Sequence, residues 1–530
     1  MRPAVFLLSL FYCSALASQS KLIASTSQGP LIGKTERFDG STVEAYLGIP
    51  YAQPPVGKLR FRKPVPLASW NGTYDARKAK HSCIQTLYPI IFHIETDLSE
   101  DCLYLNVWTP SKGGPRRPVL VWIHGGAFKF GSSHERWYNG AALASLNNVV
   151  VVSLNYRLGL FGFLNSGDEE APGNMGLWDQ NEALKWIQRN IANFGGDPDL
   201  VTLFGESAGS MSVHAHVLSP HSKGLFRRAV MLSGTLSYNL PVESVSESVQ
   251  RGDVVARMLG CAGSRAAQLR CLRAKGAEEL HKAAEEAASN RIVTFFPTSK
   301  SEFLPVLPSH AAPTKDYDPI DALVSVTADE GAFAAIFQPD TRLWAQELPQ
   351  LDDEALNKTI QILIQVWSLD RVLPIGISYI DRVASNGKQA VRKALIDFAG
   401  DAYFKCPSMA FSRNHSRDGG KVYAFVFGYR SDKYEFPEFF GVPHTSDIPY
   451  YMGGPFLDAE KYTDKDREVS RKAMDILVSF AKTGKPAHPG GLSWPVFSEK
   501  EPVFQWIQPG NYTQIKDLSE GRCERFKNLI

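Results

Sequence analysis

Short runs of consecutive apolar residues recur along the chain, and stretches with helical spacing of apolar residues lie between them. The runs are rich in strand-forming residues and predict strands at Pro118–Ile123, Val149–Tyr156, Leu200–Phe204, Ala322–Thr327 and Val422–Phe427. Residues 176–193 and 464–482 predict helices. Strands that are apolar along their length are typical of a sheet covered on both faces. The pattern therefore predicts an α/β fold with a large, mostly parallel central sheet flanked by helices.

The N-terminus has the composition of a secretory signal peptide. Arg2 supplies the positive charge, Val5–Leu16 is mostly apolar, and Ala15–Ala17 offers a small-residue cleavage site. The apolar segment is too short to span a membrane. The C-terminus carries no hydrophobic tail for a lipid anchor. We therefore expect residues 1–17 to be removed and the mature protein to be secreted into the extracellular space, with no membrane anchor.

Charge and cysteine content agree with that compartment. The formal net charge is +2 with both signs interspersed, which argues against a nucleic-acid partner. Of seven cysteines, Cys13 leaves with the signal peptide, and the remaining six are predicted to pair as Cys83–Cys102, Cys261–Cys271 and Cys406–Cys523. The sequence contains no C-x-x-C pair, the cysteine spacing that is typical of a metal site. Four glycosylation sequons are expected on surface loops or edges, at Asn71, Asn357, Asn414 and Asn511.

The most informative chemistry is the segment Gly-Glu-Ser-Ala-Gly centred on Ser207. It follows the predicted strand 200–204 and precedes a predicted helix at 211–218, which is the setting of a nucleophile elbow. Gly205 and Gly209 let the strand and the helix approach closely. The helix N-terminus favours the negative charge of an oxyanion. Ser207 is therefore the candidate nucleophile, and the N–H of Ala208 is a candidate oxyanion donor.

A serine hydroxyl needs a base, and the base needs an orienting acid. Elbow enzymes place the acid and then the histidine after the serine. Of the twelve histidines, His415 lies in a sequon and is expected to be exposed, and His488 lies in a turn-rich surface loop. His444, in a loop with aromatic surroundings, is the predicted base. The predicted strand 322–327 ends near Asp329 and Glu330, and the residues themselves leave either as the acid.

An oxyanion hole needs backbone N–H groups close to the nucleophile. The predicted strand 118–123 runs into His-Gly-Gly-Ala-Phe, a loop of the H-G-G type. Its small residues allow the backbone to approach a substrate oxygen. Gly126 and Ala127 are therefore predicted to donate hydrogen bonds together with Ala208.

Three longer motifs carry a resemblance to a known family. They are the segment from Phe194 through Ser207, the segment Glu100–Pro110, and Tyr46–Gly57 followed by Leu-Arg-Phe. With them the chain resembles the type-B carboxylesterases, the carboxylesterase/cholinesterase family of the α/β-hydrolase fold. The resemblance covers about residue 21 to the end and implies Glu330 as the acid.

The resemblance also implies roles for residues around the predicted triad. It implies the three cysteine pairs given above and electrostatic support from Glu206, the neighbour of the nucleophile. Ser233 matches a serine near the triad acid. Arg60 and Glu100 match a structural ion pair.

Cholinesterases resemble the chain over the same span, and their choline site uses a tryptophan between the first cysteine pair. Residues 83–102 contain no tryptophan here, and ungapped counting puts Phe92 at that position. Lys129 replaces a tyrosine after the oxyanion loop and is expected to repel a cationic substrate. Val293 falls where an acyl-pocket aromatic residue is expected. These departures favour uncharged carboxylic esters over choline esters.

The elements that must meet extend from about residue 124 to residue 444, which favours a single domain over residues 18–530. We expect a secreted, glycosylated serine ester hydrolase with a Ser–His–Glu triad and an acyl-enzyme intermediate. It acts on a small-molecule ester and requires no metal or cofactor. The alternatives are a choline ester hydrolase and a non-catalytic, esterase-like binding protein. Such binding relatives have typically lost triad residues. The natural substrate and the oligomeric state stay open.

Overall fold

A computed structural model of the chain describes residues 22–529 except 39, 88–93, 95, 112, 239, 289–293, 311–318, 336–360, 362–368 and 370–371. The predicted signal peptide, Phe92, Val293 and Asn357 therefore lie outside the described residues. The described part of the chain forms a central sheet with strand order β16 (Gln514–Ile515), β15 (Phe504–Ile507), β14 (Val422–Phe427), β13 (Asp321–Thr327), β12 (Arg228–Leu232), β11 (Gly196–Glu206), β9 (Arg117–Ile123), β10 (Val150–Leu154), β8 (Tyr104–Pro110), β4 (Ser41–Pro50) and β3 (Lys34–Phe38).

The sheet is parallel in its centre and antiparallel at both edges. All neighbouring strands from β10 across to β15 run parallel, whereas β8, β4 and β3 pair antiparallel at one edge and β16 at the other. Two small sheets join β1 (Ile23–Ser25), β2 (Pro30–Ile32) and β5 (Tyr74–Asp75), and β6 (Ser82–Cys83) with β7 (Leu98–Ser99). The predicted large, mostly parallel sheet is confirmed.

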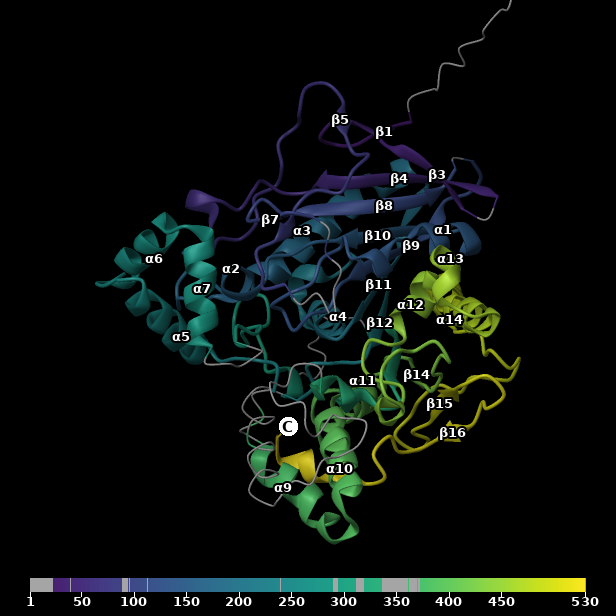
Figure 1. Cartoon of the computed structure of the whole chain (residues 1–530). Coiled ribbons are helices and arrows are strands. Elements are labelled where there is room, and N and C mark those ends of the chain that lie inside the picture. The colour runs from purple at the N-terminus through teal and green to yellow at the C-terminus, as the bar shows by residue number, and fades with distance from the viewer. Residues whose placement is uncertain are drawn as a thin grey trace, which may run out of the picture.

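Helices cover both faces of this sheet (Figure 1). Their bounds are α1 (Ala141–Asn147), α2 (Gly159–Phe163), α3 (Met175–Asn190), α4 (Ala208–Leu218), α5 (Val245–Met258), α6 (Arg265–Ala274), α7 (Ala277–Ala287), α9 (Leu373–Asp381), α10 (Lys388–Gly400), α11 (Cys406–Arg417), α12 (Ile448–Met452), α13 (Gly454–Leu457) and α14 (Asp464–Thr483). Successive strand residues alternate between two cores. Val119 and Val121 of β9 pack with α3 and α4, whereas Leu120 and Trp122 pack with α1 and α14.

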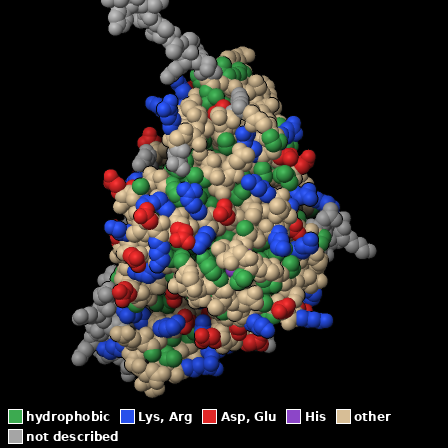
Figure 2. Space-filling view, turned by 90° about the vertical axis from the view of Figure 1, so that its right-hand side faces the viewer, with side chains coloured by type: hydrophobic (Ala, Val, Ile, Leu, Met, Phe, Trp, Pro, Cys, Tyr) green, Lys and Arg blue, Asp and Glu red, His purple; other side chains and the backbone are tan. Residues whose placement is uncertain are grey.

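The three predicted cysteine pairs are confirmed as disulfides: Cys83–Cys102, Cys261–Cys271 and Cys406–Cys523. None of the described helices is both long and apolar enough to cross a membrane. Basic and acidic side chains alternate over the face drawn in Figure 2, as the sequence predicted. The protein surface therefore offers no single-sign patch on that face.

The structure corrects two expectations of exposure. His415 is buried on α11, where its Nε2 contacts the carbonyl oxygen of Ile320 at 2.7 Å, because this helix packs its sequon against the sheet. Asn414 accordingly lies on a helix rather than in a loop, and it is half-buried. His488 is buried between the rings of Trp494 and Tyr512, although its segment is a loop.

The other two sequons within the described residues agree with the expectation. Asn71 and Asn511 are both exposed and lie outside helices. Glycosylation of either side chain is therefore sterically open.

Candidate active site

Three loops that carry predicted site residues follow parallel strands in the centre of the sheet. His124 follows β9, Ser207 follows β11, and Glu330 comes shortly after β13. The carboxyl ends of parallel strands meet at one edge of a sheet, which is where open α/β sheets place their ligands. The fold therefore brings residues separated by some two hundred positions to one edge.

Ser207 lies at a sharp turn between β11 and α4. Its φ of 56° and ψ of −123° are unfavourable for a residue with a side chain, and its N–H donates to the carbonyl oxygen of Leu232 at 3.0 Å. A Cβ on Gly209 would lie 2.0 Å from the carbonyl oxygen of Ile123, and one on Gly205 would lie 2.5 Å from Gly209. Both positions therefore require glycine, as the elbow pattern predicted.

The loop after β9 runs directly beside the nucleophile. A Cβ on Gly125 would come within 3.1 Å of the Ser207 Cβ. Gly126 and Ala127 have φ values of 105° and 54°, and a Cβ on Gly126 would lie 2.0 Å from the carbonyl oxygen of Phe130. No described residue accepts a hydrogen bond from the N–H of Gly126 or Ala127. The N–H of Ala208, the first residue of α4, belongs to the helix donors that intrahelical bonds leave unpaired.

His444 and Glu330 are in direct contact. Nδ1 of His444 lies 2.8 Å from Oε2 of Glu330, and both side chains are buried. The other carboxylate oxygen of Glu330 accepts the N–H of Thr327 at 2.7 Å. A carboxylate only accepts hydrogen bonds, so Nδ1 carries the imidazole proton and Nε2 is left free to act as a base.

Asp329 has a different function, although its neighbour in sequence contacts the histidine. Its Oδ2 accepts the N–H of Val442 at 2.9 Å, and its own N–H donates to the carbonyl oxygen of Val442 at 3.0 Å. A Cβ on Gly441, whose φ is 57°, would lie 2.1 Å from that carboxylate. Asp329 therefore fastens the loop that carries His444, and of these two acids Glu330 is the one in contact with the imidazole.

Two further carboxyl groups lie close to His444. Nε2 lies 3.0 Å from Oε1 of Glu206, although this oxygen makes no hydrogen bond of normal geometry. Burial, together with the nearby Asp447 and Glu330, raises the pKa of Glu206 well above its usual range. Burial raises the pKa of Asp447 to about 7, and the negative charge of Glu330 adds to this effect. Neither carboxylate oxygen of Asp447 has a hydrogen-bond partner among the described residues.

Ser207 lies next to this cluster, and no hydrogen bond joins its hydroxyl to His444 in the part of the chain that the structure describes. Catalytic hydrogen bonds are often long without substrate and tighten in the complex. The structure therefore brings His444, Glu330 and Glu206 together in direct contact, with Ser207 one residue beyond Glu206.

Sequence reasoning missed Asp447 and two aromatic residues around His444. Phe404 stacks on the imidazole with ring centroids 4.1 Å apart, and Phe333 contacts it at 5.2 Å. Asp447 follows His444 by three positions, and that spacing was the only available sign of it. Phe404 lies forty positions upstream in an ordinary apolar stretch, so no local pattern could identify it.

Lys129 was expected to repel cations, but its charge is paired. The side chain is buried, and Nζ lies 2.9 Å from Oε2 of Glu285 on α7. The hydroxyl of Thr86 also donates to this carboxylate at 3.2 Å. Because the pair carries no net charge, it weakens the expected repulsion of a cationic substrate, and that expectation stays a prediction.

Ser233 occupies the corresponding turn after β12. It has a φ of 56° and is fully buried, and its N–H donates to the carbonyl oxygen of Ser325 at 2.8 Å. Its hydroxyl makes no hydrogen bond to Glu330 or to any other described residue. Supporting functions for Ser233 and Glu206 stay predictions.

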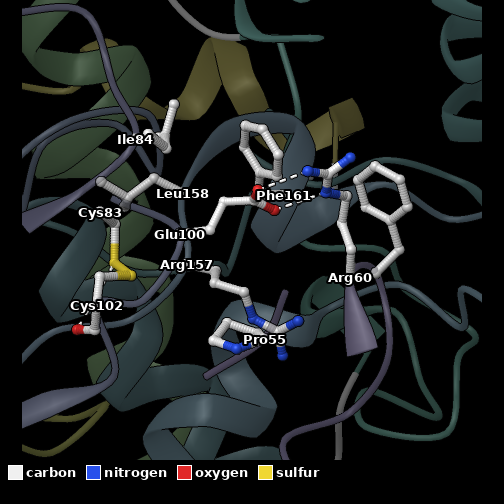
Figure 3. A pocket seen from close by; sticks show the side chains of 10 residues that line it. Pro55, Arg60, Cys83, Ile84, Glu100, Cys102, Arg157, Leu158 and Phe161 are labelled. Carbon is white, nitrogen blue, oxygen red and sulfur yellow. Dashed lines mark hydrogen bonds and ion pairs between the residues drawn. A yellow bond between two sulfur atoms is a disulfide. The ribbon is translucent and has the colours of Figure 1, made fainter. Parts of the chain in front are cut away.

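The predicted ion pair of Arg60 and Glu100 is present, away from the nucleophile. Two nitrogens of Arg60 each donate to one oxygen of Glu100 at 2.6 Å (Figure 3). The third nitrogen, Nη1, donates to three carbonyl oxygens at the C-terminal end of α6, the nearest being that of Lys275 at 2.7 Å. The adjoining cavity of about 10 Å³ has room for roughly one water molecule. This pair is therefore structural.

Among the described residues, no three or more His, Cys, Asp or Glu side chains are arranged to hold a metal ion.

Residues 20–526 match the model of the carboxylesterase family. The chain is 36% identical over 507 residues to an acetylcholinesterase of Bungarus fasciatus, covering 91% of this chain and 82% of that protein. It is also 36% identical over 529 residues to a cholinesterase of Mus musculus, covering 96% and 86%. The chain therefore belongs to the carboxylesterase family and is a carboxylic ester hydrolase with the α/β-hydrolase fold.

Proposed function

We propose that this protein is a secreted serine esterase that hydrolyses uncharged carboxylic esters through Ser207, His444 and Glu330. The observation that carries the proposal is the 2.8 Å contact between His444 Nδ1 and Glu330 Oε2 beside the strained turn at Ser207. Along the chain the nucleophile comes first, the orienting acid second and the base third, which is the order of this fold.

In the proposed reaction, Oγ of Ser207 forms a bond to the ester carbonyl carbon while Nε2 of His444 takes the hydroxyl proton. The negative charge on the carbonyl oxygen is stabilised by the N–H groups of Gly126, Ala127 and Ala208. The carbon–alkoxide bond then breaks, and His444 returns its proton to the leaving alcohol. Water attacks the acyl-enzyme by the same sequence and releases the acid.

Two considerations bear on the substrate class. The two cholinesterase relatives favour a choline ester hydrolase, and the paired charge of Lys129 weakens one objection to it. Against this, the segment between Cys83 and Cys102 contains no tryptophan, the aromatic residue that binds a cation most strongly. We therefore favour uncharged esters, with choline esters as the second candidate.

Secretion and glycosylation are part of the proposal. Three disulfides are typical of an oxidising compartment. The N-terminal composition predicts a signal peptide over residues 1–17, and the exposed side chains of Asn71 and Asn511 are available for glycans. We propose residues 18–530 as a single domain.

The test compares the mature protein with Ser207→Ala. The value of kcat/KM is measured for a short-chain aryl ester and for acetylthiocholine under identical conditions. We expect rapid aryl-ester hydrolysis that disappears in Ser207→Ala, with slow turnover of acetylthiocholine.

The other outcomes separate the alternatives. A strong preference for acetylthiocholine would show that choline esters, rather than uncharged esters, are the substrate class, and the proposed mechanism would stand. Hydrolysis that survives in Ser207→Ala would reject Ser207 as the nucleophile. Binding of an ester without turnover would favour the esterase-like binding protein.

A further inference from the structure

A π-helical turn, residues Asp401–Lys405, connects α10 to α11 beside the candidate active site. Such turns insert an extra residue into a helix and occur frequently at functional sites. Two consecutive side chains of this turn contact His444 and the segment between β13 and Glu330. Phe404 stacks on His444, and Nζ of Lys405 donates to the carbonyl oxygen of Ala328 at 2.7 Å, immediately before the turn with Asp329 and Glu330.

Both ends of this turn are fastened to the C-terminal segment of the chain. Asp401 is fully buried, and its Oδ2 accepts hydrogen bonds from Nε of Arg522 at 2.7 Å and from the hydroxyl of Tyr379 at 2.9 Å. The residue after the turn, Cys406, forms the disulfide with Cys523. Adjacent residues 522 and 523 therefore hold the two ends of the turn, and Phe404 is fixed between them.

The geometry of the Phe404 ring suits a positive charge on His444. The two rings are nearly parallel, with an interplanar angle of 25°, and Phe404 is only 3% exposed. The face of an aromatic ring is negative and attracts a cation, more strongly where water is excluded. Phe333 contacts the imidazole in a tilted arrangement at 54°, which presents less of its face.

The charged groups around the imidazole come from three elements. Glu330 lies at its Nδ1, Glu206 lies at the end of β11 beside its Nε2, and Asp447 precedes α12. The nearest cation on the π-helical turn, Lys405, is directed to a backbone carbonyl. Glu330 and Glu206 lie at the two imidazole nitrogens, whereas Phe404 covers a face of the ring.

We propose that Phe404 is a positioning residue that holds the plane of His444 and stabilises its imidazolium during acyl transfer. This inference rests on the proposed function of His444 as the general base. The reaction forms the imidazolium when Nε2 takes the Ser207 proton, and the interaction with the ring face is strongest at that moment. The π-helical turn and its two C-terminal attachments supply the required rigidity.

The test makes the face of the ring less negative while keeping the shape of the ring. In one variant Phe404 becomes trifluorophenylalanine, which has nearly the same size but a much less negative face. Phe404→Leu removes the ring, and Phe398→Leu is the matched control. Phe398 is 1% exposed and stacks on Phe526 without a ring contact to His444.

We expect the acid limb of the kcat/KM profile to move to lower pH by about half to one unit in both Phe404 variants. The sign follows because losing the ring face disfavours the protonated imidazole, so the neutral base persists to lower pH. We also expect kcat to fall by about three- to tenfold. Phe398→Leu should leave the acid limb unchanged.

An independent measurement separates this inference from the proposed function. In a Ser207→Ala background, the midpoint of titration is followed by proton NMR of the His444 Nδ1–H resonance. A lower midpoint with trifluorophenylalanine supports the inference even if the parent enzyme hydrolysed no ester. A trifluorophenylalanine variant with an unchanged midpoint and acid limb would overturn it, whatever Phe404→Leu did to activity.

Discussion

Buried and partly buried acids have different surroundings in two regions of the molecule. In the scaffold, Glu100 accepts two hydrogen bonds from Arg60, and Asp179 accepts two from Nε and Nη2 of Arg157, at 2.8 and 2.7 Å. Around His444, Glu330 and Glu206 contact the imidazole and Asp447 lies nearby. Among the described residues, no lysine or arginine forms an ion pair with Glu206, Glu330 or Asp447.

The difference has a physical consequence. A buried carboxylate beside a guanidinium has its charge compensated in every state of the protein. A buried carboxyl group without a permanent cation is driven towards its protonated form, and the pKa values of Glu206 and Asp447 are accordingly raised. The carboxylates of Glu100 and Asp179 each have a guanidinium partner, whereas the carboxyl groups around His444 have none among the described residues.

The largest expected effect comes from removing the charge that orients His444. Glu330→Gln should lower kcat about 10³–10⁴-fold, because the amide no longer fixes the tautomer or stabilises the imidazolium. The thermal midpoint of unfolding should change little. Asp329→Asn is the control, since Asp329 fastens the loop without touching the imidazole. An equal loss of kcat in the two variants would mean that loop position, rather than charge, controls the histidine.

Replacing a scaffold acid should have the opposite effect, with a loss of stability and little change in kcat. Asp179→Asn leaves Arg157, whose side chain is 3% exposed, as an uncompensated buried charge. We expect the free energy of unfolding to fall by about 3–5 kcal/mol, with kcat per folded molecule near the wild-type value. Denaturant unfolding and active-site titration measure the two quantities. Loss of kcat at full stability would contradict the distinction between the regions.

Asp447 connects stability to pH. Its folded pKa of about 7 lies above the ordinary value near 4, so the folded protein holds this proton more tightly than the unfolded chain. The contribution of Asp447 to the free energy of unfolding therefore falls as pH rises from about 4 to 7, by up to about 1.4 kcal/mol per unit. Asp447→Asn should match the wild type at pH 4 and exceed it at pH 8. The prediction fails if the difference between their unfolding free energies does not grow with pH.

The smallest effect concerns Lys129 and Glu285, which resemble a scaffold pair but lie at the oxyanion loop. Glu285→Gln leaves the lysine charge uncompensated. We expect kcat/KM for acetylthiocholine to fall a few-fold relative to an aryl ester, and added salt to reduce the difference. Glu279→Gln, on the exposed side of the same helix, is the matched control. A rise in the relative rate for acetylthiocholine would show that Lys129 does not act on the substrate through its charge.

Local patterns were sufficient where the chemistry depends on neighbours in sequence. The elbow at Ser207 and the loop at Gly126 were predicted because strand, turn and helix follow one another directly. Apolar runs predicted five strands of the parallel centre, β9, β10, β11, β13 and β14, whereas β12 and β15 were not predicted. The antiparallel edge was not predicted either. Buried and exposed positions along β4 follow no regular alternation, and its pairing with β8 shifts register between Tyr46 and Ile49.

Burial was predicted less well, because it depends on what packs against a segment. His415 has the sequence context of a surface residue, but α11 turns it towards the carbonyl oxygen of Ile320. Lys129 has the sequence context of an exposed charge, but α7 supplies Glu285 from more than 150 positions away. Such partners carry no local signal.

The sequence by itself predicted a nucleophile and an oxyanion loop, and it determined the cysteine pairs and the family, because each depends on short motifs or on sequence similarity. Only the tertiary structure decided that Asp329 fastens the loop of His444, which carboxyl groups surround His444, and that Phe404 covers its ring. These contacts join elements through the carboxyl edge of the sheet and through a turn fastened by the C-terminal segment. Their energies depend on distance and on the exclusion of water, and neither quantity can be read from the local sequence.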